Sequence, residues 1–149
     1  MGTVILGISL TRRAVGIVLL KGSDLLDWST HTDNATALTA ALSAIHKYPV
    51  SHLSVVASNS KRREPIKEHF AMEYIAHTGT GSIAASRYSV YELRKKIPPG
   101  RFESKTSLFG YLSEVFPELE ATYHKYLQKR NPCLNALFEA VACAYVVTV

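Results

Sequence analysis

The chain has 149 residues, of which 47% are apolar and 19% are charged. This composition excludes a disordered or collagen-like chain, and the length suits a single globular domain over residues 1–149. The apolar run at residues 15–20 is far shorter than the ~20 residues that span a bilayer, and the Met-Gly-Thr start has no basic region of the kind that opens a signal peptide. We therefore expect a cytoplasmic protein that does not enter the membrane.

The net charge is +5, from 17 basic and 12 acidic residues, and the excess lies in one part of the chain. Residues 61–105 carry ten basic and five acidic side chains, whereas residues 1–60 carry four and three, and residues 106–149 carry three and four. A local excess of positive charge attracts a polyanion such as nucleic acid. It is also typical of a solvated surface, so charge alone leaves both interpretations open.

The first thirty residues have the pattern of a three-stranded antiparallel sheet. Apolar and β-branched residues dominate segments 3–10, 15–21 and 25–31. Turn-forming residues separate these segments at 11–13 and at 22–24. We therefore predict three consecutive strands joined by two tight turns.

A helix and then a further strand are predicted next. Asp33 and Asn34 can cap a helix, apolar residues recur at helical spacing as far as Tyr48, and Pro49 ends it. Residues 52–57 then form an apolar run of strand length. Because a helix precedes this run, we expect the new strand to lie parallel to an earlier one.

The second half of the chain is mostly helical. A helix is expected from about Lys61, then a short strand at 82–85 and a short basic helix at 90–97 that Ser89 caps. Further helices are predicted at 106–116, at 118–128 and from Leu134 almost to the end. The order of elements, βββαβαβα, predicts an α/β protein in which antiparallel and parallel strands share one mixed sheet, with helices on both faces.

Two segments resemble those of a known nuclease family. RNase H-like nucleases of the RuvC and YqgF type begin with a strand that reads Gly-Ile-Asp-x-Gly, and a second glycine starts the next strand; residues 6–18 here (LGISLTRRAVGIV) are similar. The segment Asn135-Ala-Leu-Phe-Glu139 resembles the Asp-Ala-Leu-Ala type of final helix in RuvC resolvases. The resemblance implies an RNase H-like fold over nearly the whole chain, with structured or branched nucleic acid as the substrate class.

The resemblance also implies where a metal site would lie. Nucleases of this family hold a pair of Mg²⁺ ions with acids from the first strand, the end of the fourth strand and the last helix. The matching positions here are Ser9 on the first strand and residues 57–59 (Ala-Ser-Asn) after the fourth. On the last helix, Asn135 and Glu139 lie four residues apart on one face. Glu139 is the only carboxylate among these positions, and it is either a retained site residue or a surface residue.

Basic residues are the clearest positive sign of a ligand. One set lies near the ends of the first and fourth strands, and another surrounds the short basic helix; both are expected to contact phosphates. The residues are Arg12, Arg13, Lys61, Arg62, Arg63, Arg94, Lys95, Lys96 and Arg101. Tyr88, Tyr91 or Phe102 could stack on an unpaired base. The alternative is that these cations are ordinary solubilising charge that points in different directions.

These observations favour a catalytically degenerate RuvC-like protein that binds structured or branched DNA or RNA without a cofactor. One alternative is an active metal-dependent endonuclease with relocated acids, which would use Glu139 and Mg²⁺ or Mn²⁺. The other is a non-catalytic scaffold or partner-binding module. A homodimer is a further prediction, because the apolar residues 145–147 could cover a partner, although they could equally fill the core of their own domain.

Overall fold

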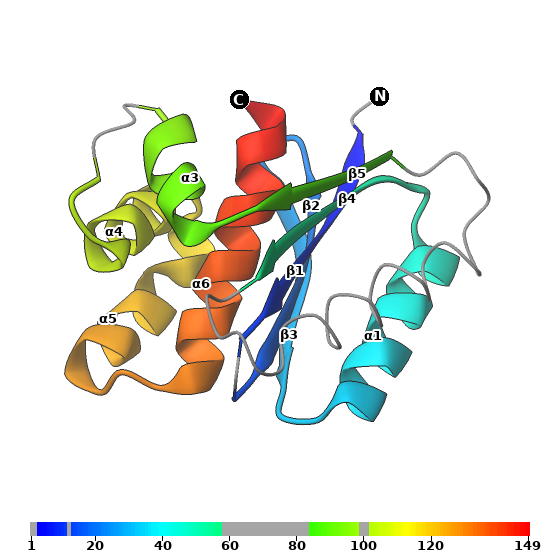
Figure 1. Cartoon of the computed structure of the whole chain (residues 1–149), viewed down its shortest axis with the longest axis horizontal. Helices are drawn as coiled ribbons and strands as arrows, with labels where there is room; N and C mark the ends of the chain where they lie inside the picture. The colour runs from blue at the N-terminus through cyan, green and yellow to red at the C-terminus, as the bar shows by residue number, and fades with distance from the viewer. Residues whose placement is uncertain (1–2, 12, 58–83, 99–101) are drawn as a thin grey trace.

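A five-stranded mixed sheet forms the middle of the protein. The computed structural model describes residues 3–11, 13–57, 84–98 and 102–149. Across the sheet the strands lie in the order β3-β2-β1-β4-β5 (Figure 1). Their bounds are β1 Val4–Leu10, β2 Val15–Lys21, β3 Asp24–His31, β4 Val50–Ala57 and β5 Ala84–Tyr88.

The sheet combines two kinds of strand pairing. β1, β2 and β3 form an antiparallel meander, in which Ser9 lies opposite Gly16. β4 pairs parallel with β1, and β5 pairs parallel with β4. The predicted three-stranded start and the parallel fourth strand are therefore confirmed, as is the mixed α/β class.

The fifth strand differs from its predicted position. The sequence predicts it at 82–85, whereas the strand occupies Ala84–Tyr88. Residues 86–88 extend the pairing because they lie opposite residues 54–56 of β4. The strand then stops at Ser89, whose side chain caps the next helix. Pairing with a neighbour, rather than local composition, therefore decides where this strand ends.

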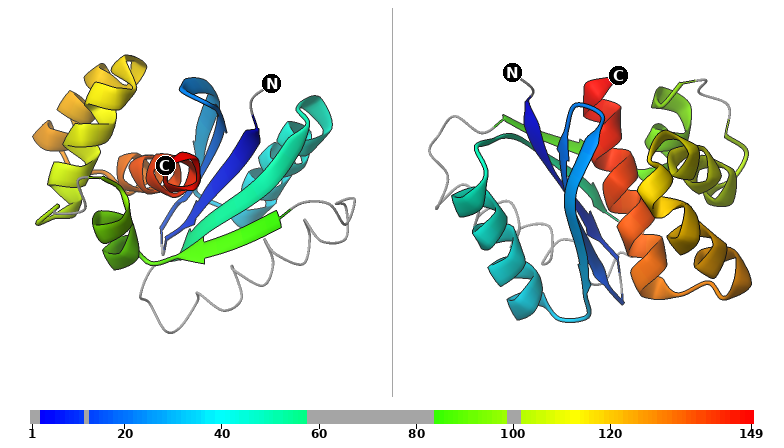
Figure 2. Two further views of the ribbon diagram at one scale, coloured as in Figure 1. Left: turned by 90° about the horizontal axis from the view of Figure 1, so that it is seen from above. Right: turned by 180° about the vertical axis from the view of Figure 1, so that it is seen from behind.

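Helices cover both faces of the sheet. α1 lies against one face and α6 against the other, with α3, α4 and α5 on the same side as α6 (Figure 2). The bounds are α1 Asn34–Lys47, α3 Val90–Lys96, α4 Lys105–Val115, η1 Pro117–Leu119, α5 Glu120–Gln128, α6 Pro132–Tyr145 and η2 Val146–Thr148. The helix expected from Lys61 lies outside the described residues. No helix in the described ranges is long and apolar enough to cross a membrane.

Side-chain caps decide where several helices begin. Asp33 accepts a hydrogen bond from a first-turn amide of α1, and Ser89 caps α3, as the sequence predicts. Glu92 completes a capping box with Ser89. The last helix begins at Pro132, earlier than predicted. Asn131 caps this helix, and proline suits a first turn because the amide it lacks would have no helical partner there.

Two glycines let α6 pack closely on the sheet. A β-carbon at Gly16 would lie 2.3 Å from the backbone oxygen of Ala136, and one at Gly7 would lie 2.5 Å from that of Ala140. Real β-carbons do not approach other atoms so closely, so only glycine lets the helix backbone rest directly on the strands. Residues 136–144 of α6 are all buried. The helix is therefore the centre of the hydrophobic core on its side of the sheet.

Replacing Gly16 with alanine should destabilise the protein. The added methyl group must push α6 away from β2 or distort the strand, an overpacking cost of about 1–3 kcal/mol. Urea denaturation followed by circular dichroism measures the change in the free energy of unfolding. Gly110→Ala is the matched control, because its β-carbon would meet the movable hydroxyl end of Tyr123 at 2.8 Å, and alanine favours the helix. Equal losses in the two variants would contradict the close approach of α6.

Candidate functional site

The carboxyl ends of β1 and β4 meet the beginning of α6. Gly16, which pairs with Ser9 near the end of β1, touches Ala136, so α6 starts at that edge of the sheet. Side chains alternate along a strand, and Ser9 therefore faces α6 together with Gly7. Ligands of open α/β sheets commonly bind beyond the carboxyl ends of parallel strands. This edge is the candidate site.

Small polar groups are buried between the sheet and α6. Ser9 on β1 is 0% exposed, and its Oγ atom has no hydrogen-bond partner within the described residues. Ser54 on β4 is also buried, and the Cys143 thiol donates to its backbone oxygen at 3.4 Å. Burial raises the pKa of Cys143 to about 12, so the thiol stays protonated and serves packing. Sequence reasoning missed Ser54, although a serine between the apolar residues Leu53 and Val55 marks it.

Three polar side chains form a chain from the surface to a buried carboxylate. Lys105, at the start of α4, donates from Nζ to Asn135 Oδ1 at 3.2 Å. Asn135 in turn donates from Nδ2 to Glu139 Oε2. Glu139 is only 3% exposed. Burial raises the pKa of Glu139, and the charge of Lys105 and the hydrogen bond from Asn135 oppose this increase only in part.

The described residues at this edge do not provide the ligands for a pair of Mg²⁺ or Mn²⁺ ions. Such ions need several oxygen ligands, above all carboxylates. Across residues 3–11, 13–57, 84–98 and 102–149, no three His, Cys, Asp or Glu side chains are grouped so that they could hold a metal. The amide oxygen of Asn135 already accepts a hydrogen bond from an ammonium group. Ser9, Asn135 and Glu139 therefore lie at one end of the sheet without forming a metal site among themselves.

A basic groove lies beside this polar chain. Its volume is about 460 Å³. The lining residues are Thr11, Arg13, Lys105, Tyr126, Arg130, Asn131, Pro132 and Asn135. Within the described part of the chain, three of these residues are cationic and none is acidic, so the groove carries positive charge. The beginning of α6 adds the positive end of a helix dipole, because Asn131 and Pro132 form its cap and first residue.

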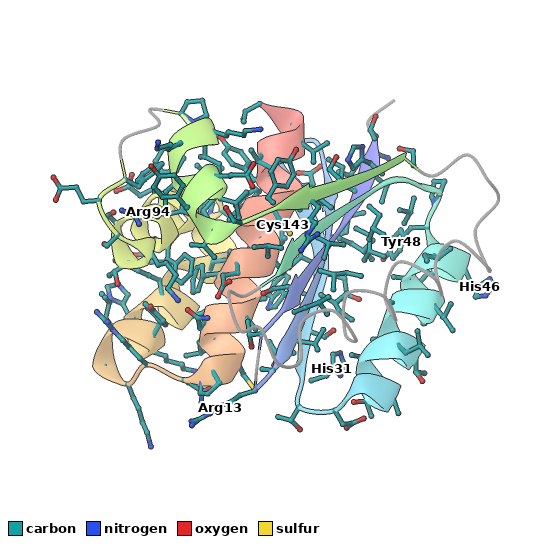
Figure 3. All side chains as sticks on the ribbon, in the orientation of Figure 1. Arg13, His31, His46, Tyr48, Arg94 and Cys143 are labelled. Atoms are coloured by element: carbon teal, nitrogen blue, oxygen red, sulfur yellow. The ribbon has the colours of Figure 1, made fainter. Side chains whose placement is uncertain are left out.

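Three separate parts of the chain supply the cations of the groove. Arg13 lies in the turn between β1 and β2, at the end of the molecule where α6 begins (Figure 3). Arg130, before α6, donates from Nη2 to Thr106 Oγ1 at 3.3 Å, and its guanidinium carbon lies 5.9 Å from the ring centroid of Tyr126. Lys105, on α4, is held by its hydrogen bond to α6. The groove therefore forms only when these elements pack together.

The structure separates the predicted phosphate contacts. Arg13 lines the groove. Arg94 instead donates from Nε to the backbone oxygen of Phe102 at 3.0 Å and from Nη2 to that of Glu103, so it fastens the segment before α4. Figure 3 shows Arg13 and Arg94 well apart, so α3 does not contribute to the groove. Lys95 and Lys96 lie exposed on α3. The predicted residues Arg12, Lys61, Arg62, Arg63 and Arg101 lie outside the described residues.

Sequence reasoning missed Lys105 and Arg130. Each lies next to the cap of a helix: Lys105 follows Ser104 at the start of α4, and Arg130 precedes Asn131 at the start of α6. A cation beside a cap lies next to the positive end of the helix dipole, which also attracts anions. This combination is the sequence signal that would have identified both residues.

Comparison with solved structures identifies the fold. No protein-family model and no curated protein matches the sequence. RuvC from Thermus thermophilus matches with a TM-score of 0.67 at 12% identity, over 97% of this chain and 92% of that chain. The chain has a RuvC-type RNase H-like fold. T. thermophilus RuvC in complex with a Holliday junction substrate also matches, with a TM-score of 0.58 at 12% identity, over 97% of this chain and 91% of that chain. The RuvC-type fold predicted from the sequence is confirmed, and at this identity the similarity establishes the fold alone.

Replacing Glu139 with glutamine should raise stability at neutral pH. Burial makes the ionised carboxylate unfavourable in the folded protein, so the wild-type protein loses stability as the pH rises through the raised pKa of Glu139. Glutamine keeps an oxygen that can accept from Asn135 but does not ionise. Urea denaturation at several pH values measures the difference between the two proteins. It should be largest at neutral pH and should vanish below the ordinary range of carboxyl pKa values.

The matched control for this measurement is Glu114→Gln, which removes an exposed carboxylate from α4. This variant shows what the loss of one surface carboxylate does by itself, so the effect of burial is the part of the pH-dependent difference that only Glu139→Gln produces. A Glu139→Gln variant that is less stable than the wild-type protein at neutral pH would contradict the interpretation, since it would show that the folded protein stabilises the ionised form.

Proposed function

We propose that this protein binds structured or branched nucleic acid through the basic groove at the start of α6, without metal-dependent cleavage. The observation that carries the proposal is the convergence of Arg13, Lys105 and Arg130 on one groove whose described lining holds no acid. The RuvC structure that contains a Holliday junction supports nucleic acid as the class of ligand.

The groove suits phosphate groups better than neutral ligands. One guanidinium group can donate two parallel hydrogen bonds to the oxygens of a phosphate, and a lysine ammonium group adds a compact positive charge. The first turn of α6 supports the same ligand, because the positive end of the helix dipole favours anions. A nucleic acid bound in this way releases condensed counterions, so its affinity should fall steeply with salt concentration.

The surroundings of Glu139 support a role without cleavage. Hydrolysis by two metal ions requires several ionised carboxylates that face the metals. Glu139 is buried, its pKa is raised, and its neighbour Asn135 is hydrogen-bonded to Lys105. Strand scission of a four-way junction in Mn²⁺ that disappears in Glu139→Ala would overturn this part of the proposal and favour the endonuclease alternative.

The double variant Arg13→Gln/Arg130→Gln should bind nucleic acid more weakly and with less dependence on salt. Each phosphate contact in duplex DNA contributes about 0.9 to the slope of log affinity against log salt concentration, so the slope should fall by roughly 2. Fluorescence anisotropy with a labelled four-way junction, a duplex, a single strand and an RNA hairpin, at low and near-physiological salt without metal, measures both quantities.

The matched control is Lys21→Gln/Lys47→Gln, which removes the same number of charges. Lys21 ends β2 at the edge of the sheet opposite the groove, and Lys47 ends α1 on the other face. The control should keep both the affinity and the slope. Equal effects of the two double variants would show that net charge rather than the groove drives binding, and no binding by the wild-type protein at low salt would favour the scaffold alternative.

A homodimer and a cytoplasmic location stay predictions. The segment suggested as a dimer contact largely fills the core of its own chain: Val146 is 7% exposed, and the Tyr145 ring centroid lies 5.8 Å from that of Phe116. This packing favours a place for residues 145–147 in the core of their own domain over a dimer contact. Light scattering over a range of protein concentrations distinguishes monomer from dimer.

A further inference from the structure

Two tyrosines, each with a lysine against its ring, lie on β5 and α3, outside the basic groove. Lys95 Nζ lies 4.3 Å from the ring centroid of Tyr91, in the first turn of α3. Lys96 Nζ lies 5.4 Å from the ring centroid of Tyr88, the last residue of β5. We call Tyr88, Tyr91, Lys95 and Lys96 the α3 patch.

The α3 patch has a rigid support. Leu93 and Ile97 on the other side of the helix are both 0% exposed, so they anchor α3 in the core. A capping box closes the first turn. Arg94 binds the backbone oxygens of Phe102 and Glu103 and thereby joins α3 to the following segment. The helix that carries Tyr91, Lys95 and Lys96 is therefore fixed in place before any ligand arrives, which lowers the entropic cost of binding.

The patch combines an open aromatic face with positive charge. Tyr91 is 60% exposed even with the Lys95 ammonium group beside it, so part of its ring can meet a ligand. Lys95 lowers the pKa of the Tyr91 hydroxyl through a hydrogen bond and its charge. The helix carries three cations and one acid, Glu92, which takes part in the cap and lies 4.0 Å from Lys96. Positive charge therefore predominates around the rings.

We propose that the α3 patch binds an unpaired nucleobase and its flanking phosphate. The flat face of a base can stack on Tyr91, while the phosphate meets the ammonium groups of Lys95 and Lys96. An apolar peptide or a lipid chain would leave these charges without partners, and an intact duplex keeps its bases stacked inside. The proposal rests on the proposed nucleic-acid binding and adds that the ligand has unpaired bases.

The positions of the two surfaces fit such a ligand. Arg94, on the helix of the α3 patch, and Arg13, in the groove, lie well apart (Figure 3). A single phosphate group therefore cannot reach both. A branched or gapped nucleic acid has paired segments, whose backbone suits the groove, and unpaired bases, which suit the α3 patch. A mononucleotide shares the chemistry of an unpaired base with a phosphate, so the test must separate these two sources.

The test is the fluorescence of 2-aminopurine in a short single-stranded DNA, measured together with anisotropy. Binding to the wild-type protein should quench the fluorescence, because the base stacks on Tyr91. Tyr91→Ala should abolish the quenching and weaken single-strand binding by about tenfold, whereas Tyr91→Phe should keep both. Lys95→Gln should weaken binding. Lys47→Gln is its matched control, because Lys47, at the end of α1, also lies beside a tyrosine ring, with its Nζ 5.5 Å from the ring centroid of Tyr48, but outside the α3 patch.

The outcomes separate the α3 patch from the groove. A Tyr91→Ala variant that folds, binds and quenches like the wild-type protein would overturn the α3 patch. If Arg13→Gln/Arg130→Gln binds duplex normally while Tyr91→Ala no longer binds the single strand, the proposed role of the groove is overturned and that of the α3 patch is supported. Adenosine monophosphate that displaces the strand at a similar concentration would assign the patch to a free nucleotide, and displacement only at far higher concentration would assign it to a strand.

Discussion

The candidate site depends on the direct contact of α6 with strand backbone at Gly7 and Gly16. Neither residue has a side chain, so the helix lies closer to β1 and β2 than a β-carbon would permit. The contact fixes the start of α6 at the carboxyl end of β1, beside Ser9. Glu139 belongs to the buried stretch of α6, so the same contact removes its carboxylate from water. The close packing of α6 on Gly7 and Gly16 therefore also accounts for the burial of Glu139.

Burial of Glu139 accounts for the polar chain that leads to it. A buried carboxylate without partners is unfavourable, and hydrogen bonds and nearby positive charge reduce this cost. Asn135 donates to the carboxylate, and Lys105 supplies positive charge one residue further out. Because Lys105 is on α4, the chain also ties α4 to α6 and holds an ammonium group at the groove. The interactions that reduce the cost of burying Glu139 therefore also place the Lys105 ammonium group at the groove.

Sequence signals that act within a few residues predicted most of the elements. Asp33 and Ser89 cap helices through their own first turns, and apolar alternation marks the strands. The pairing of Lys105 with Asn135 joins residues 30 positions apart, and it depends on how α4 packs on α6. Arg94 likewise looks like a free cation in the sequence, because only the fold shows its two carbonyl partners. The site could therefore be located by family resemblance, but the sequence could not show that Arg94, unlike Arg13, lies outside the groove.

The proposed function gives a physical meaning to the neutral residues Ser9 and Asn135. In a metal-dependent nuclease, carboxylates at this edge repel phosphate, and bound cations must overcome that repulsion. Here Ser9 and Asn135 carry no charge, and the Glu139 carboxyl group is buried and linked through Asn135 to Lys105. A phosphate group bound in the proposed groove would therefore meet Arg13, Lys105 and the start of α6 with little opposing charge. On this view, neutral residues at the carboxyl edge of β1 allow the fold to hold nucleic acid without metal ions.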